Sequence, residues 1–188
     1  MKVAYLLLAF ALPLSACNKS PEIHEKNVSV ADVAQKVRDA GVGNGGFLDP
    51  GQWRTVSTLE EMNIPGAPAE AQAIMKQMAS KTSNTTFEYC LTPEEARKPS
   101  GKFFAGKDRG NCRYESFDMS GGKMDAVMSC RGEPSGTVTL AMHGTYSPDE
   151  YVSHGEMKIE GSPQGAMTMK MRTEAKRIGE CAAKTAQG

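Results

Sequence analysis

The chain has 188 residues, with 22 basic and 22 acidic side chains, so its formal net charge is zero. This balance gives no basic surface of the kind that binds nucleic acid, and we expect no nucleic-acid partner. The length suits one domain with a hydrophobic core.

The first 16 residues have the features of an export signal. Lys2 gives a short positive start, and Val3–Leu14 is almost continuously apolar. That run is shorter than the roughly 20 apolar residues that cross a bilayer, so residues 1–16 are predicted to be a secretory signal peptide. The tripeptide "LSA" stands directly before Cys17 and resembles a bacterial lipobox.

A lipobox implies that Cys17 is lipidated and becomes the mature N-terminus, with residues 17–28 as a flexible tether. Each buried acyl methylene contributes ~0.8 kcal/mol, so several chains anchor a protein firmly to a membrane. By resemblance to lipoprotein sorting, Asn18 favours the periplasmic face of the outer membrane. The alternative is an ordinary signal peptide cleaved after Ala16, in which Cys17 has no special role.

Residues 29–42 are predicted to form an amphipathic helix. Ser29 is suited to the N-cap, and Asp32 completes a pair that resembles a capping box. Residues 52–62 then alternate as a strand that buries Trp53.

A second helix is predicted over residues 68–80, with Ile74, Met75 and Met78 on one face. From Thr86 onward the pattern changes to period two. Strands are expected at 86–91, 111–119, 123–130, 136–146, 150–160 and 166–175. Short connectors rich in Gly, Pro, Ser and Asp separate the later strands and indicate hairpins.

The fold class is therefore mainly β (α+β). We expect an antiparallel meander of about six to eight strands, curved or partly closed as a barrel. Two short helices would lie N-terminal to the main sheet. The β domain would span residues 47–181, followed by a tail at 182–188.

The turns also predict the register. A fold at Pro148 places Leu140 opposite Met157, and a fold at Pro163 places Met157 opposite Met169. A slip of one residue would invert every side chain, so the agreement of several strands on one apolar face supports this register. The candidate ligand-face residues are Met128, Leu140, Met142, Met157, Met167, Met169 and Met171.

Methionine dominates this face, which leaves three interpretations open. Two helices can cover the face as an ordinary core. Alternatively, a concave sheet can hold an acyl chain, because unbranched, polarizable Met side chains suit a surface that adapts to varied partners. Thioethers also bind Cu(I), although the residues form a stripe rather than a convergent ligand set.

The same register places His143 opposite His154, and Tyr146 opposite Tyr151, on the polar face. Directly opposed residues have Cβ atoms ~5 Å apart, which is close enough to share a copper or zinc ion. Glu156 is the candidate third ligand. The alternative is two solvated neighbours.

Four cysteines remain after Cys17, and an even number in an oxidising compartment predicts two disulfides. A fold at Gly121 places Cys112 opposite Cys130, which leaves Cys90 to pair with Cys181. Four free thiols are the alternative.

The same fold at Gly121 has one difficulty. It places Tyr114, Ser116 and Asp118 on the apolar face, and Phe117 and Met119 on the opposite face. A β-bulge near residues 120–122 would correct this arrangement.

Several ordered motifs between residues 49 and 181 are similar to the bacterial domain-of-unknown-function family 3617. They are "DPGQWRTVSTLEEMNIPGAP", "CLTPEEA", "CRYESFDMSGGKMDAVMSC", "GTYSPDEY" and "MTMKMRTEAKRIGEC". The resemblance implies a small exported protein of proteobacteria, often a lipoprotein, with the four cysteines at the family's positions. It implies no activity and no ligand, and the segment before Asp49 lies outside it.

The sequence has no nucleophile elbow, phosphate-binding loop or metalloprotease helix, so we expect neither an enzyme nor a cofactor. Two hypotheses remain. The first is a monomeric lipoprotein of the envelope that binds a lipophilic ligand on the Met-rich face. The second is a structural or interaction protein of the envelope that binds another protein and no small ligand.

Overall fold

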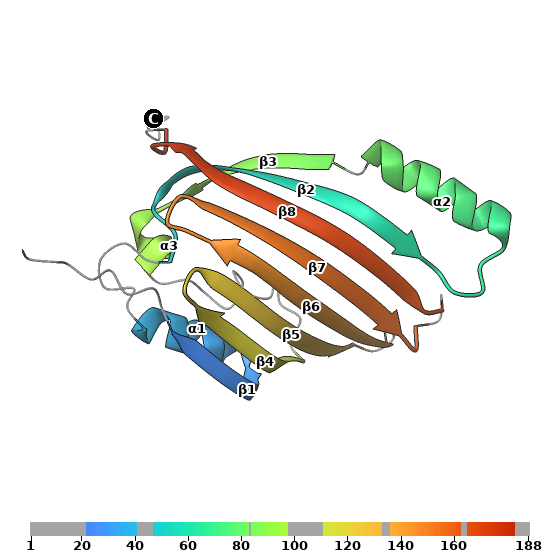
Figure 1. Cartoon of the computed structure of the whole chain (residues 1–188), viewed down its shortest axis with the longest axis horizontal. Coiled ribbons are helices and arrows are strands. Elements are labelled where there is room, and N and C mark those ends of the chain that lie inside the picture. The colour runs from blue at the N-terminus through green and yellow to red at the C-terminus, as the bar shows by residue number, and fades with distance from the viewer. Residues whose placement is uncertain are drawn as a thin grey trace, which may run out of the picture.

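The computed structural model describes residues 22–40, 47–82, 84–97, 111–132, 136–162 and 165–182. This part forms one eight-stranded antiparallel sheet and three helices (Figure 1). The strands are β1 (Ile23–Ser29), β2 (Gly51–Asn63), β3 (Asn84–Leu91), β4 (Cys112–Ser120), β5 (Lys123–Gly132), β6 (Gly136–Tyr146), β7 (Glu150–Glu160) and β8 (Met167–Gly179). The helices are α1 (Val30–Asp39), α2 (Ala69–Thr82) and α3 (Pro93–Arg97).

The strand order is β1-β4-β5-β6-β7-β8-β2-β3, and the sheet does not close. Strands β4 to β8 form the predicted meander, since each pairs with the next along the chain. β2 joins the meander beside β8, and β1 joins it beside β4, so β1 and β3 are the two edges (Figure 1).

The predicted register of β5 to β8 is confirmed. Leu140 is opposite Met157, and Met157 is opposite Met169. Met128 is opposite Leu140, so the apolar row runs across four strands. We call this side of the sheet the inner face and the opposite side the outer face.

Helix α1 covers the inner face at the β1–β4–β5 end. Val33 and Val37 are fully buried and pack in one cluster with Tyr114, Phe117 and Met119. The predicted cap of this helix is confirmed. The backbone N–H of Asp32 donates to Ser29 Oγ at 3.1 Å, and the backbone N–H of Ser29 donates to Asp32 Oδ2 at 3.3 Å.

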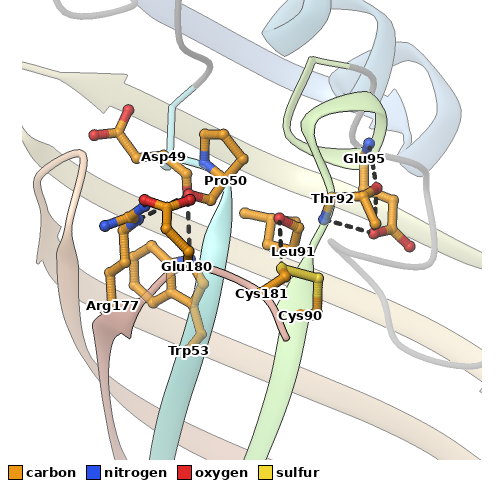
Figure 2. The surroundings of a disulfide bond; sticks show 10 residues. All are labelled: Asp49, Pro50, Trp53, Cys90, Leu91, Thr92, Glu95, Arg177, Glu180 and Cys181. Atoms are coloured by element: carbon orange, nitrogen blue, oxygen red, sulfur yellow. Dashed lines mark hydrogen bonds and ion pairs between the residues drawn. A yellow bond between two sulfur atoms is a disulfide. The ribbon is translucent and has the colours of Figure 1, made fainter. Parts of the chain in front are cut away.

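A second core surrounds Trp53, whose burial was predicted (Figure 2). The Trp53 indole N–H donates to the Asp49 carbonyl at 3.0 Å, and Arg177 Nε donates to the Pro50 carbonyl at 2.7 Å. These bonds fix the chain that enters β2 against the end of β8. The other buried members of this core are Leu48, Leu91, Ala96 and Ala175.

Both predicted disulfides are present. Cys112 and Cys130 are opposite each other on β4 and β5, with a Cα–Cα distance of 4.0 Å. Cys90 and Cys181 have a Cα–Cα distance of 5.4 Å and tie the end of β3 to the segment after β8 (Figure 2).

The predicted tether over residues 17–28 is wrong for its last part, because Ile23–Ser29 is strand β1. Ile23 is buried and Val28 packs against the same cluster. Asn27 has φ 55°, a left-handed conformation that Asn tolerates, and it interrupts the alternation of the strand. Ile23 and Val28, five positions apart, therefore reach the same core although the strand does not alternate regularly between them.

The helices predicted at residues 29–42 and 68–80 are present as α1 and α2, but their predicted placement N-terminal to the main sheet is not confirmed. They do not precede the sheet, because β1 comes before α1, and α2 lies between β2 and β3. α2 packs on β2, and its Ile74 side chain is 58% exposed, so this predicted apolar residue does not cover the Met-rich face. No helix in the described ranges is long and apolar enough to span a bilayer.

The predicted bulge exists but lies elsewhere. The register shifts between Tyr114 and Ser116, so Glu115 is the extra residue. Phe117 and Met119 therefore point inward with Tyr114 and are fully buried, whereas they were predicted on the opposite face from Tyr114. Ser116 and Asp118, predicted on the apolar face, alternate with these buried positions and lie on the outer face.

Candidate ligand-binding face

The inner face continues beyond the part that α1 covers. On β7 and β8 it carries methionines, and β2 adds two apolar residues at opposed positions. We define the Met patch as Leu59, Met62, Met157, Ile159, Met167, Met169 and Met171. Every member is partly or largely exposed, and Met171 is 40% exposed.

A groove borders the Met patch, with a cavity volume of about 240 Å³. It is lined by Met128, Cys130, Val138, Leu140, Gly155, Met157 and Met171. Gly155 leaves room here, since a Cβ at this position would lie 3.6 Å from Leu140 Cδ1 and 4.0 Å from Met142 Cγ. None of the described lining residues is charged, so the groove favours an apolar occupant.

The seven predicted ligand-face residues lie in three places: the groove, the adjoining Met patch and the core under α1. Met128, Leu140, Met157 and Met171 line the groove, and Met167 and Met169 belong to the adjoining Met patch. Met142 packs against the core under α1 and does not line the groove.

Leu59 and Met62 were missed from the sequence. They lie opposite Met171 and Met169 on β8. The register shifts between Leu59 and Glu61, which places two inner-face residues three positions apart. Period-two alternation therefore does not reveal them, and only the pairing of β2 with β8 does.

The two tyrosines predicted on the polar face lie on the inner face instead. Tyr146 is four residues after Met142 on the same strand and therefore shares its side. Its ring packs edge-on against Phe47 at 5.2 Å, and the ring of Tyr151 lies 6.2 Å from Trp53. Burial raises the pKa of both phenols, which stay neutral at physiological pH.

The predicted histidine pair comes together on the outer face. The rings of His143 and His154 stack with centroids 5.2 Å apart. His154 Nδ1 is 3.9 Å from Glu60 Oε2. In the pairing of β7 with β8, Arg172 lies opposite His154.

Ligands for a metal do not converge at this pair. Glu156, the candidate third ligand, is 3.1 Å from Lys158 Nζ in an ion pair. No group of three or more His, Cys, Asp or Glu in the described residues is arranged to hold a metal ion. The histidine pair is therefore a weaker candidate site than the groove.

The rest of the outer face is charged and solvated. Lys170 Nζ donates to Glu61 Oε2 at 2.7 Å, and this hydrogen bond raises the pKa of Lys170. Arg54 Nε donates to Glu88 Oε1 at 2.8 Å. The contrast with the apolar inner face indicates that only one side of the sheet is suited to a lipophilic ligand.

Comparison with known proteins places the chain in a family. Residues 48–181 match the model of a family described as Protein of unknown function (DUF3617). The chain belongs to the DUF3617 family. The match contains β2 to β8, both disulfides and the groove, and it leaves out β1 and α1. Neither the curated proteins nor the solved structures contain a match.

The predicted lipidation site, Cys17, lies outside the described residues, as do the signal segment 1–16 and the tail from residue 183. Lipidation therefore stays a prediction of the sequence.

Proposed function

We propose that this DUF3617 protein is a lipoprotein of the cell envelope that holds an acyl chain of a lipophilic ligand on its Met patch. The observation that carries the proposal is an apolar sheet face left partly uncovered beside an apolar groove. Phe117 is 0% exposed under α1, whereas Met171 on the same face is 40% exposed. Contiguous exposed apolar surface of this kind marks interaction sites in soluble proteins.

The chemistry of the groove favours a flexible hydrocarbon. Three of its lining residues are methionines, whose unbranched thioether chains adapt to irregular shapes. Each methylene that leaves water contributes about 0.8 kcal/mol, so even part of an acyl chain supplies useful affinity. Among the described lining residues, no charged side chain has to be desolvated when an alkyl chain enters.

The sequence supplies the second argument. A signal segment at residues 1–16 and lipidation at Cys17 would hold the protein at a membrane surface. Acyl lipids are abundant at that surface, so anchor and ligand would come from the same environment.

Native mass spectrometry of the Cys17→Ser protein, exported with both disulfides formed, tests this function. Removing the anchor ensures that any lipid mass comes from a non-covalent ligand. We expect a mass excess that matches a lipid and disappears after solvent extraction. The bare mass of the disulfide-bonded chain would contradict the proposal and direct attention to a protein partner.

Two variants localise the ligand. Gly155→Leu fills the groove and should abolish the lipid mass. Ala141→Leu adds similar bulk to the outer face of the neighbouring strand and should leave it unchanged. A metal-sized excess that is lost in His143→Ala would instead identify the histidine pair as the site.

A further inference from the structure

A row of hydroxyl groups crosses the inner face next to the Met patch. Ser153 on β7 is opposite Thr173 on β8, which is opposite Ser57 on β2. Ser57 is opposite Thr85 on β3. We call these four residues the hydroxyl row. It lies one inner-face position beyond Gly155 and Met171, so it directly adjoins the groove.

The hydroxyl row retains hydrogen-bonding capacity. Ser57 Oγ and Thr173 Oγ1 are 3.3 Å apart and share one hydrogen bond in a half-buried position. A hydroxyl offers one donor and two acceptor lone pairs, so this single bond leaves both groups able to bind an oxygen-containing ligand.

A buried polar group lies in the next row. Thr55 is 1% exposed, its hydroxyl interacts with Tyr151, and its Oγ1 makes no hydrogen bond of good geometry with any described residue. Tyr151 lies in the same row, two positions from Ser153. Burial is the main factor that raises the pKa of Tyr151 and of its neighbour Tyr89, so these phenols are neutral donors or acceptors.

Charge is absent from this part of the inner face. The described inner-face positions from Met167 to Thr173 and their partners on β2, β6 and β7 carry no charged side chain. Arg177 is further along β8, where it bonds to Pro50 and pairs with Glu180. A half-buried carboxylate needs a cation or several strong donors, so an acidic head group is disfavoured here.

The dimensions agree with one acyl chain. The seven residues from Met167 to Thr173 are separated by six steps of the strand and therefore span roughly 20 Å. One leaflet of a bilayer's hydrocarbon core is about 15 Å thick, which is the reach of an acyl chain. A chain that lies along β8 would therefore place its polar end at the hydroxyl row and its methyl end near Met167.

We infer that the ligand is an uncharged acyl ester, with its chain on the Met patch and its ester and alcohol oxygens at Ser57 and Thr173. This inference rests on the proposed function and specifies its ligand class. The experiment compares 1-monolaurin with laurate, two probes with the same chain length. Titration calorimetry uses delipidated Cys17→Ser protein at pH 8, below the concentrations at which either probe forms micelles.

We expect monolaurin to bind at least about tenfold more tightly than laurate, the effect of roughly one hydrogen bond. Ser57→Ala with Thr173→Val should remove this preference by weakening monolaurin alone. Thr139→Val with Thr168→Val makes similar changes on the outer face and should retain the preference. Circular dichroism and intact disulfides verify the fold of both variants.

The outcomes separate this inference from the proposed function. If both probes bind equally and Gly155→Leu blocks both, the Met patch binds acyl chains but the head-group inference is wrong. Tighter binding of laurate, or a preference that survives Ser57→Ala with Thr173→Val, also overturns it. If neither probe binds, the proposed function itself fails.

Discussion

Two regions of the same inner face differ in what lies on them. At the β4–β5 end, α1 covers Tyr114 and Phe117, and both are 0% exposed. At the β7–β8 end, the described helices leave Met171 40% exposed. The alternation of the strands decides which side chains share the face, whereas the position of one helix decides which of them become core.

The side chains of the two regions also differ. The covered region also contains methionines, but rings and branched chains surround them, and Tyr114 packs edge-on against Phe117 at 5.1 Å. The Met patch contains five methionines on three adjacent strands and no ring. Rings fix one packing arrangement, while Met chains allow several, so the first region is suited to hold the fold and the second to accommodate a ligand.

Truncation should distinguish the regions most strongly. Phe117→Ala leaves a cavity in the covered region and should lower the free energy of unfolding by about 3–5 kcal/mol. Met169→Ala, on the exposed patch, should cost less than about 1.5 kcal/mol because solvent fills the space. Urea unfolding of the two variants measures both values. Equal losses would show that the Met patch is core.

Alkaline pH provides a second contrast. Burial raises the pKa of Tyr114 from 10.0 to about 12. The folded state therefore resists ionisation, and its stability is fully present below pH 10 and declines as the pH rises toward 12. This residue accounts for roughly 2–3 kcal/mol of the decline. Tyr114→Phe should flatten the fall in unfolding free energy between pH 9 and pH 11, and an unchanged slope would show that Tyr114 ionises as readily in the folded state as in the unfolded state.

Enlarged side chains test the available space. Met119→Trp overpacks the covered region and should cost about 1–3 kcal/mol. Met169→Trp projects over the open patch and should leave stability nearly unchanged while it hinders ligand binding. Thermal unfolding compares the two, and a large loss for Met169→Trp would mean that the patch is closed.

The smallest expected effect concerns helix α1, which covers the β4–β5 end of the inner face. Ser29→Ala removes the N-cap of α1 and should cost about 1 kcal/mol. Hydrogen exchange should then increase in α1 and β4, while β7 and β8 keep their protection. Equal acceleration in all four elements would show that the two regions open together.

The meander could be predicted because its turns are short and marked, so counting outward from Pro148 gives the pairing of β6 with β7. The bulge at Glu115 could not. No glycine or turn signal within β4 marks Glu115 as the extra residue, and the burial of Phe117 and Met119 with α1 becomes apparent only in the fold. β1 was missed because Asn27 breaks its alternation.

The candidate site could be predicted only in part, because local turns specify some of its residues and long-range strand pairing specifies the others. The methionines of β7 and β8 follow from local turns. Leu59 and Met62 depend on the pairing of β2 with β8, two strands that are far apart in the sequence. The place where α1 rests is a tertiary property, and it determines which part of the Met-rich face stays open.

Methyl NMR of the Cys17→Ser protein, labelled with ¹³C at the methionine methyl groups, tests the central claim most directly. Methionine-to-leucine variants assign the signals, and 1-monolaurin is the ligand. We predict that the methyl signals of Met157, Met169 and Met171 shift on titration, while those of Met119 and Met124 stay in place. Signals that do not move, or that shift equally in both regions, would contradict the assignment of the Met patch as the ligand-binding face.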